Sequence, residues 1–375
     1  VQAFQAWRYD VGQVGDLSDV VAPPYDVIDE TFQDELYKAH PCNCVRVDLN
    51  RAEPEDAGVE DRYARAAKYM KQWQQDGVLI REHEDCLYVY HQEFEWEGTK
   101  YVRKGFLGRL KLEEFGKGNV FPHEQTMPGP KKDRLALMYA CQANLSAIFG
   151  LYPDRENEAQ TILEDAAISL TPLVATDHLG VVHRMWPVSD PAAIAKVQAI
   201  LADKPIFIAD GHHRYETSCN YKNELAEAGQ LNETSPANHT LMMFCGMEDP
   251  GLAILPTHRL VSGFPELGSD DIKAALGEHF SIEEVETAEA AWESMEMDGG
   301  QKVFGIGTPS DGKWLLLRAT DTSPMNELAP EQSDVWRGLG VSILHRQIVD
   351  HLLKGKHPEA DPKFKFVHLM DEVHT

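Results

Sequence analysis

Residues 205–216 read Pro205-Ile206-Phe207-Ile208-Ala209-Asp210-Gly211-His212-His213-Arg214-Tyr215-Glu216, and we expect the rest of the fold to build around them. The apolar run at the start is typical of a short buried strand, which Asp210 and Gly211 end. The apolar spacing after Tyr215 predicts a helix that stops near Gly229. A strand, a glycine turn and a helix start together present free N–H groups and the positive end of a helix dipole, which suit an anion.

The composition limits the class of protein. The chain has 375 residues, enough for two domains or one large one with a substantial core. Its net charge of −26 disfavours a general nucleic-acid binder, because such proteins carry a basic face. No apolar run approaches the roughly 20 residues that span a bilayer, so we expect no membrane partner. The 6 cysteines form no C-x-x-C pair, which predicts reduced thiols and a cytoplasmic location.

The spacing of apolar residues predicts an α/β protein of the mixed α+β kind, with mixed sheets and flanking helices. We expect an α+β region at 1–118, a core at 119–265 and a further α/β region at 266–375. The more distinctive elements that the patterns predict are strands at 44–49, 147–152, 240–245 and 252–255, a hairpin of 86–95 with 100–110, and helices at 60–75, 135–142 and 335–353.

Three clusters combine histidine with arginine or lysine beside Gly or Pro turns: Pro122–Arg134, Asp210–Glu216 and Thr257–Arg259. Basic side chains bind phosphate or carboxylate oxygens, and a histidine or a carboxylate moves protons near neutral pH. A site for a phosphorylated substrate needs both kinds of group. The candidates for proton transfer are His123, Glu124, Asp210 and His213. The candidates for binding substrate or phosphate are Lys131, Lys132, Arg134, Asn144, Ser146, Gly211, His212, Arg214, Thr257, His258 and Arg259.

Each candidate also has an ordinary structural interpretation. His212 and His213 would then be one packed and one exposed imidazole, and Glu124 a surface carboxylate paired with Lys131 or Lys132. His213 and Glu216 are three apart on the predicted helix and could share a metal. Without an H-E-x-x-H motif or a cysteine set, however, we expect no zinc site. The fingerprints of P-loop, Rossmann and nucleophile-elbow enzymes do not occur either.

Several motifs together resemble one large bacterial and archaeal family, domain of unknown function one-zero-one-five, over nearly the whole chain. The family's members continue beyond the point where Thr375 ends this sequence, so the resemblance implies a truncated C-terminal region. The core Asp210–Arg214 also resembles the signature of free serine kinases in the ParB/sulfiredoxin superfamily, which implies a ParB/sulfiredoxin-like core around that turn. The motifs that carry the family resemblance are 7–9, 19–28, Pro122-His123-Glu124-Gln125-Thr126, 144–152, 209–216 and 255–259.

The second resemblance implies phosphoryl transfer between a donor and the hydroxyl of free L-serine, giving O-phosphoserine. Asp210–Arg214 would hold the phosphate and Glu124 would act as the base. Lys131, Lys132 and Arg134 would neutralise the donor (ADP, ATP or pyrophosphate) together with Mg²⁺. The alternatives are a phosphoserine phosphatase-like hydrolase, a non-catalytic sensor of a phosphorylated metabolite, and ParB-like nucleic-acid binding, which the charge disfavours. The sequence leaves the oligomeric state open.

Overall fold

The computed structural model describes residues 1–96, 98–122, 128–253, 257–367 and 373. Contacts between residues divide the chain into two units, Val1–Ala253 and Ile254–Thr375. The expected regions 1–118 and 119–265 both contribute strands to one sheet of the first unit. None of the described helices is long and apolar enough to cross a membrane.

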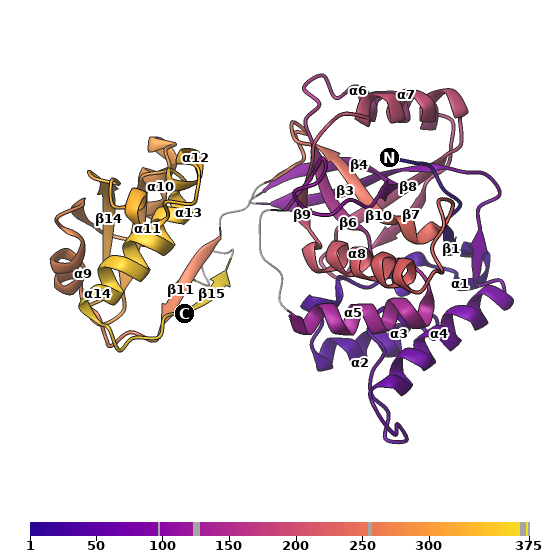
Figure 1. Ribbon diagram of the computed structural model, residues 1–375, viewed down its shortest axis with the longest axis horizontal. Helices are drawn as coiled ribbons and strands as arrows, with labels where there is room; N and C mark the ends of the chain where they lie inside the picture. Colours follow the sequence, from indigo (N-terminus) through magenta and orange to yellow (C-terminus); the bar gives the residue numbers. More distant parts are fainter. Residues whose placement is uncertain (97, 123–127, 254–256, 368–372, 374–375) are drawn as a thin grey trace. The chain divides into compact units, whose positions relative to one another are not determined.

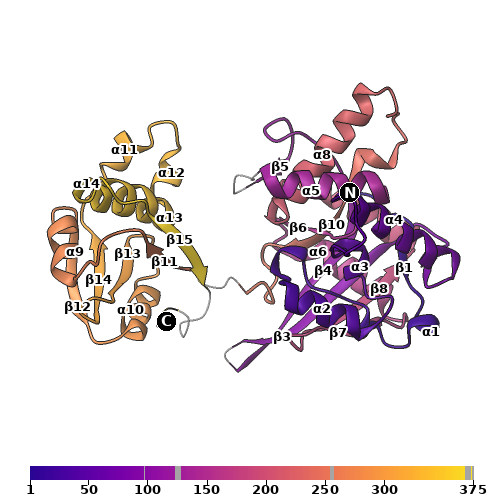
Figure 2. The ribbon, with the colours of Figure 1, turned by 90° about the horizontal axis from the view of Figure 1, so that it is seen from below.

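The first unit combines one large sheet with helices (Figures 1 and 2). Its helices are α1 (Val11–Val14), α2 (Glu30–Ala39), α3 (Val45–Asp48), α4 (Glu60–Gln75), α5 (Pro128–Cys141), α6 (Glu158–Ala167), α7 (Pro191–Leu201) and α8 (His212–Glu227), with the 3₁₀ turns η1 (Leu17–Asp19), η2 (Tyr25–Val27) and η3 (Pro236–Asn238). Its strands are β1 (Trp7–Tyr9), β2 (Leu79–Arg81), β3 (Leu87–Trp96), β4 (Thr99–Lys111), β5 (Val120–Phe121), β6 (Ile148–Tyr152), β7 (Leu173–Thr176), β8 (Val182–Val188), β9 (Ile206–Asp210) and β10 (His239–Gly246).

Eight of the described strands form one sheet in the order β5-β9-β6-β10-β4-β3-β8-β7. The pairs β5–β9 and β6–β10 are parallel, and the other neighbours are antiparallel. The predicted mixed α/β class, with mixed and antiparallel sheets flanked by helices, is therefore confirmed. A ParB/sulfiredoxin-like core stays a prediction.

The large core of this unit lies between the sheet and its helices. Leu163 of α6 and Val197 of α7 are fully buried and pack in one cluster with Phe106 and Phe244 of the sheet. Helix α7 begins after Asp190, because the Asp190 side chain accepts hydrogen bonds from two first-turn amides and a proline follows it. The rigid sheet then fixes where each strand ends, and the candidate site lies at one of these ends.

The strand predicted at 44–49 is wrong, because Val45–Asp48 is the short helix α3. Alternating valines favour a strand, but the buried Asn43 decides the local structure. Its Oδ1 accepts from the Val45 amide at 3.0 Å, and its Nδ2 donates to two carbonyls of the η1 region. A side chain that supplies the local backbone with hydrogen bonds outweighs the preference of valine for strands, which depends strongly on context.

Two further predicted elements need correction. Leu252 and Ala253 form no strand, because Asp249 holds a turn there by accepting from the Gly251 amide at 3.0 Å, and 254–256 lie outside the described residues. The helix predicted at 335–353 is interrupted near Gly338, where Leu339 is extended. Ser333 caps the first turn, since its hydroxyl accepts a hydrogen bond from the Trp336 amide at 3.2 Å.

The second unit has its own core and two small sheets. Its three-stranded sheet has the order β12-β14-β13, and β11 pairs with β15 in an antiparallel ribbon. Its described elements are β11 (His258–Ser262), α9 (Ser269–Leu276), β12 (Phe280–Val285), α10 (Ala288–Asp298), β13 (Val303–Thr308), β14 (Lys313–Ala319), α11 (Met325–Leu328), α12 (Asp334–Arg337), α13 (Gly340–Ser342), the π-helix η4 (Ile343–Leu353), α14 (Lys354–Lys356) and β15 (Lys363–Val367).

Candidate functional site

The predicted strand, glycine turn and helix are confirmed as β9, Gly211 and α8. Gly211 has a φ of +91°, and a Cβ there would lie 3.0 Å from the guanidinium carbon of Arg214. Only glycine meets both demands without strain. The Arg214 guanidinium pairs with Asp210 and donates to the carbonyl of Ala147. It therefore joins the turn to the loop that precedes β6.

That loop lies beside the turn because β6 and β9 are antiparallel, with Phe149 opposite Asp210. The start of one strand therefore meets the end of the other. Asn144 accepts a hydrogen bond from Thr240 at 3.1 Å, and Thr240 also contacts Ser218 of α8 at 3.1 Å. These bonds fix the loop that carries Asn144 and Ser146 against both β10 and α8.

Helix α5 brings the first basic cluster to the second, because α5 packs against α8 (Figure 2). The Lys131 ammonium forms an ion pair with Glu216 at 2.8 Å. Lys132 on the next position is exposed to solvent. The described part of the first cluster and the second cluster, some 80 residues apart in sequence, thus lie next to each other.

Arg134, one turn further along α5, is buried with an exposed fraction of 8%. Its guanidinium donates to Asp133 Oδ2 at 2.9 and 2.7 Å, and to the carbonyl and Oδ1 of Asp48 at 2.9 and 3.1 Å. It also lies over the ring of Tyr25, 4.0 Å from the centroid. Four hydrogen bonds and a ring leave this guanidinium little capacity for a ligand, so its main effect is to hold the two carboxylates.

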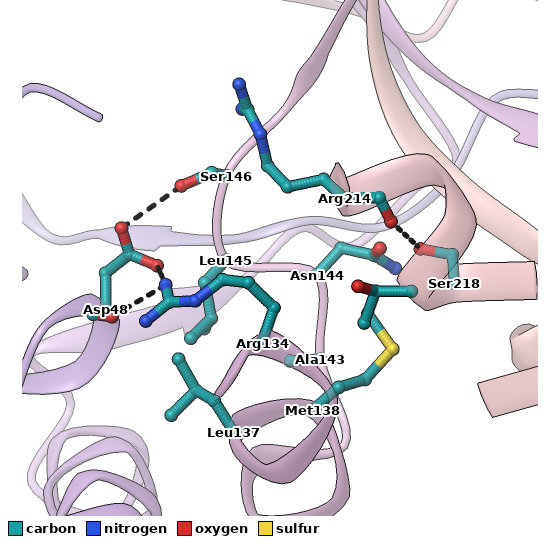
Figure 3. A pocket seen from close by; sticks show the side chains of 11 residues that line it. Asp48, Arg134, Leu137, Met138, Ala143, Asn144, Leu145, Ser146, Arg214 and Ser218 are labelled. Atoms are coloured by element: carbon teal, nitrogen blue, oxygen red, sulfur yellow. Dashed lines mark hydrogen bonds and ion pairs between the residues drawn. The ribbon is translucent and has the colours of Figure 1, made fainter. Parts of the chain in front are cut away.

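Asp48 is the acid of the site that the sequence analysis missed. It ends α3, and its Oδ2 accepts from Ser146 at 3.3 Å while Oδ1 accepts from Arg134, as Figure 3 shows. Burial raises the pKa of its carboxyl, and the Arg134 charge and the Ser146 bond lower it only in part. The strand prediction at 44–49 concealed it. Asn43, a capping residue just ahead of Val45, is the signal that could have revealed the helix.

These residues line a small pocket, which we call the Asp48 pocket (Figure 3). Its volume is about 40 Å³. That volume corresponds to roughly three water molecules. It therefore suits a group the size of a phosphate, a carboxylate or an ammonium. The lining residues are Asp48, Arg134, Leu137, Met138, Ala143, Asn144, Leu145, Ser146, Arg214, Thr217 and Ser218.

Thr217 is the unusual polar group of this pocket. The residue is 1% exposed, and its hydroxyl has no hydrogen-bond partner among the residues that the structure describes. Buried hydroxyls normally find a partner, because an unpaired one costs about 1–3 kcal/mol. Ser218, its neighbour, is satisfied by the Arg214 carbonyl at 3.0 Å. Because Thr217 lines the pocket, its unpaired hydroxyl lies beside the space that a ligand would occupy.

The remaining candidates fall in different places. His212 is buried and His213 is half-buried at the start of α8. His123 and Glu124 lie outside the described residues, so their predicted roles stay predictions. Strand β5, which precedes these two residues in the sequence, pairs with β9, and Phe121 lies opposite Phe207. The described end of β5 is therefore next to the strand that leads to Gly211.

Thr257, His258 and Arg259 belong to the second unit, on or beside β11. The His258 ring lies 5.3 Å from that of Trp292. The Asp48 pocket is built from the first unit alone.

Metal ligands can be considered on the described residues alone. No group of three or more His, Cys, Asp or Glu side chains converges within those parts of the chain. Mg²⁺ does not require such a group, because it keeps several waters and is bound through one or two carboxylates plus substrate phosphates. The Asp210 carboxylate, 56% exposed beside the glycine turn, fits that description.

Comparison with known proteins was made on the whole chain. No curated protein and no solved structure matches it. A family model does match, over residues 1–342, and it carries the description "Protein of unknown function (DUF1015)". The family resemblance seen in the sequence is thereby supported, and the chain belongs to the DUF1015 family of proteins of unknown function.

Proposed function

We propose that the first unit transfers a phosphoryl group to or from the hydroxyl of a small amino acid, with free L-serine as the preferred substrate. The main support for this proposal is the position of Arg214. It borders the Asp48 pocket and also pairs with Asp210 beside the glycine turn that starts α8. The proposed phosphate site and the small polar pocket would therefore share one guanidinium.

The phosphate would lie at the N-terminus of α8. The helix has 16 residues, and its cap Gly211 has no side chain to occupy the first amides. Backbone N–H groups at such a position bind phosphate, and the helix dipole adds attraction. The Arg214 guanidinium supplies the charge, once it turns from Asp210 towards the ligand. Lys131 and the exposed Lys132 would neutralise the donor at the same edge.

The amino acid would place its polar head in the Asp48 pocket. Asp48 offers a carboxylate for the ammonium group, and Thr217 and Asn144 offer a hydroxyl and an amide for the carboxylate of the substrate. Glu124 would accept the proton from the substrate hydroxyl, a contribution of about 10²–10⁴ in rate. Chemistry of this kind depends mainly on position and on stabilised charge, which these groups supply.

Mg²⁺ and a phosphate donor complete the proposal. Asp210 is the described carboxylate that would hold the ion, and the bound ion would neutralise charge on the donor phosphates. ADP, ATP and pyrophosphate stay equal candidates for the donor, because nothing in the Asp48 pocket distinguishes them.

The test is an assay for phosphate transfer by the full chain. L-Serine is incubated with Mg²⁺ and each of the three donors, and O-phosphoserine is quantified. We expect Glu124→Gln to lower turnover by about 10²–10⁴ while O-phosphoserine still binds. Arg214→Ala should weaken the binding of O-phosphoserine. Arg81→Ala, which removes an exposed arginine of β2, is the matched control and should change neither.

Other outcomes identify the alternatives. Release of phosphate from O-phosphoserine without a donor would support a hydrolase. Ligand-dependent thermal stabilisation without any turnover would support a sensor of a phosphorylated metabolite. Full activity in both site variants would refute the assignment of the residues.

A further inference from the structure

The ribbon of the second unit presents an arginine among aromatic rings. Strands β11 and β15 lie side by side (Figure 1). Arg259 of β11 pairs with Phe366 of β15, and Val261 pairs with Phe364. Directly paired and alternate residues of a ribbon share one face. The guanidinium carbon of Arg259 lies 5.6 Å from the centre of the Phe366 ring. Arginine, Val261 and two phenylalanines therefore share one surface.

Arg259 has few partners among the described residues. Its Nη1 donates to the carbonyl of Thr257, its Nε is buried without an acceptor, and no carboxylate pairs with it within the described residues. Burial lowers the pKa of the guanidinium. In the same unit Arg318 pairs with Asp298 at 2.9 Å. In a chain with 61 acidic against 35 basic residues, an arginine without an acidic partner among the described residues is unusual.

A histidine completes this surface. His345 is in the first part of the π-helix η4, and its ring centre lies 4.6 Å from that of Phe364. Arg259 contacts Phe366 and His345 contacts Phe364, and these two rings lie on the same face of β15. Burial and the charge of Arg259 lower the pKa of His345. Asp350 opposes that effect, but it is ion-paired with Arg346 at 3.7 Å. π-Helical turns are rare and are frequent at functional sites.

We propose that Arg259 and His345 bind the oxyanion of a small ligand, a phosphate or a carboxylate, whose apolar part rests on Phe366 and Val261. The side chains of Phe366 and Val261 are 56% and 40% exposed, so such a ligand can reach them. An oxyanion beside the guanidinium supplies the negative charge that no described carboxylate gives Arg259, and it offsets the repulsion between the guanidinium and a protonated imidazole. This site belongs to the second unit and does not depend on the function proposed for the first.

The experiment follows the imidazole signals of the full chain by NMR, with His345→Gln used to identify the His345 signal. The probes are inorganic phosphate, phenyl phosphate and benzoate. We expect a saturable shift of the His345 signal, at a lower concentration for phenyl phosphate than for inorganic phosphate. A response to phosphates alone or to benzoate as well identifies the head group that the site prefers.

Variants separate specific binding from general charge effects. Arg259→Gln should weaken binding by about tenfold or more, and Arg259→Lys, which keeps the charge without the planar fork, should give an intermediate affinity. Arg318→Gln removes an equal charge from the same unit and should leave the affinity unchanged. The proposal is overturned if no probe shifts the His345 signal saturably, or if Arg318→Gln weakens binding as much as Arg259→Gln.

Discussion

Two partly buried carboxylates of the first unit, Glu164 and Asp48, face cationic partners, and yet their pKa values are shifted in opposite directions. Burial disfavours the charge of Glu164, but bonds from His91, Gln160 and Lys104 outweigh it and lower its pKa to about 2. Those three bonds are 3.0, 3.1 and 3.1 Å long. For Asp48 burial dominates and the pKa is raised.

The difference separates a structural ion network from a candidate site. Glu164 joins α6 to β3 and β4, and all its partners are in place, so it stabilises the fold. Asp48 receives one guanidinium that it shares with Asp133, and a serine hydroxyl at 3.3 Å. A carboxylate in a pocket with few hydrogen-bond donors and a shifted pKa is typical of a binding or catalytic site.

The largest expected effect comes from removing the cation of the candidate site. Arg134→Met leaves the buried Asp48 without its cation and Asp133 with Arg62 as its remaining ionic partner, so it should lower the free energy of unfolding by about 3–5 kcal/mol. Urea denaturation measures it. The matched control is Arg184→Met, which breaks an exposed pair with Glu93 at 2.6 Å and should cost at most about 1 kcal/mol. Equal losses of stability in the two variants would show that the ion pairs of Arg134 contribute no more than the Arg184–Glu93 pair.

The second prediction concerns pH and Glu164. Its pKa falls from an ordinary 4.5 to about 2, so its stabilisation is complete above pH 4.5 and is lost as the pH falls towards 2. We expect it to contribute about 2–3 kcal/mol at neutral pH. Urea denaturation at several pH values should give a shallower loss of stability on acidification for Glu164→Gln than for the parent chain. Parallel curves would contradict the assignment.

Asp48→Asn should behave in the opposite way. A carboxyl whose pKa is raised on folding costs stability above its ordinary range, so removing its charge should leave the free energy of unfolding at neutral pH unchanged or raise it by up to about 1 kcal/mol. Serine-dependent turnover or O-phosphoserine affinity should fall by about 10–100-fold, the worth of a charged hydrogen bond. A loss of stability like that of Glu164→Gln would make Asp48 a structural residue.

The sequence was sufficient wherever local pattern and tertiary packing agree. The period of α4, from Glu60 to Gln75, predicted both of its ends, and the turn at Gly211 followed from residue types that tolerate few alternatives. Asp48 could not be predicted in the same way, because its helix depends on Asn43 and on carbonyls of a distant turn. A pattern of alternating valines cannot reveal such bonds. The π-helix η4 was missed for a similar reason, since period alone does not distinguish it from an α-helix.

The smallest effect tests whether the Asp48 pocket is built for a ligand. Thr217→Val replaces an unpaired buried hydroxyl with a methyl group of similar size, so the free energy of unfolding should stay unchanged or rise by up to about 1 kcal/mol. Ser218→Ala, the matched control on the next residue, removes a hydroxyl bonded to Arg214 and Thr240 and should cost about 1 kcal/mol.

If Thr217 serves a ligand, the more stable variant should also bind O-phosphoserine about 3–10-fold more weakly, because the lost hydrogen bond is worth about 1 kcal/mol. Calorimetric titration measures that affinity in both variants. Higher stability with unchanged affinity would mean that the hydroxyl faces no ligand. Lower stability would mean that the Thr217 hydroxyl has a hydrogen-bond partner in the folded chain. The contrast between Glu164, whose hydrogen bonds are all formed, and the polar groups of the Asp48 pocket would then no longer hold.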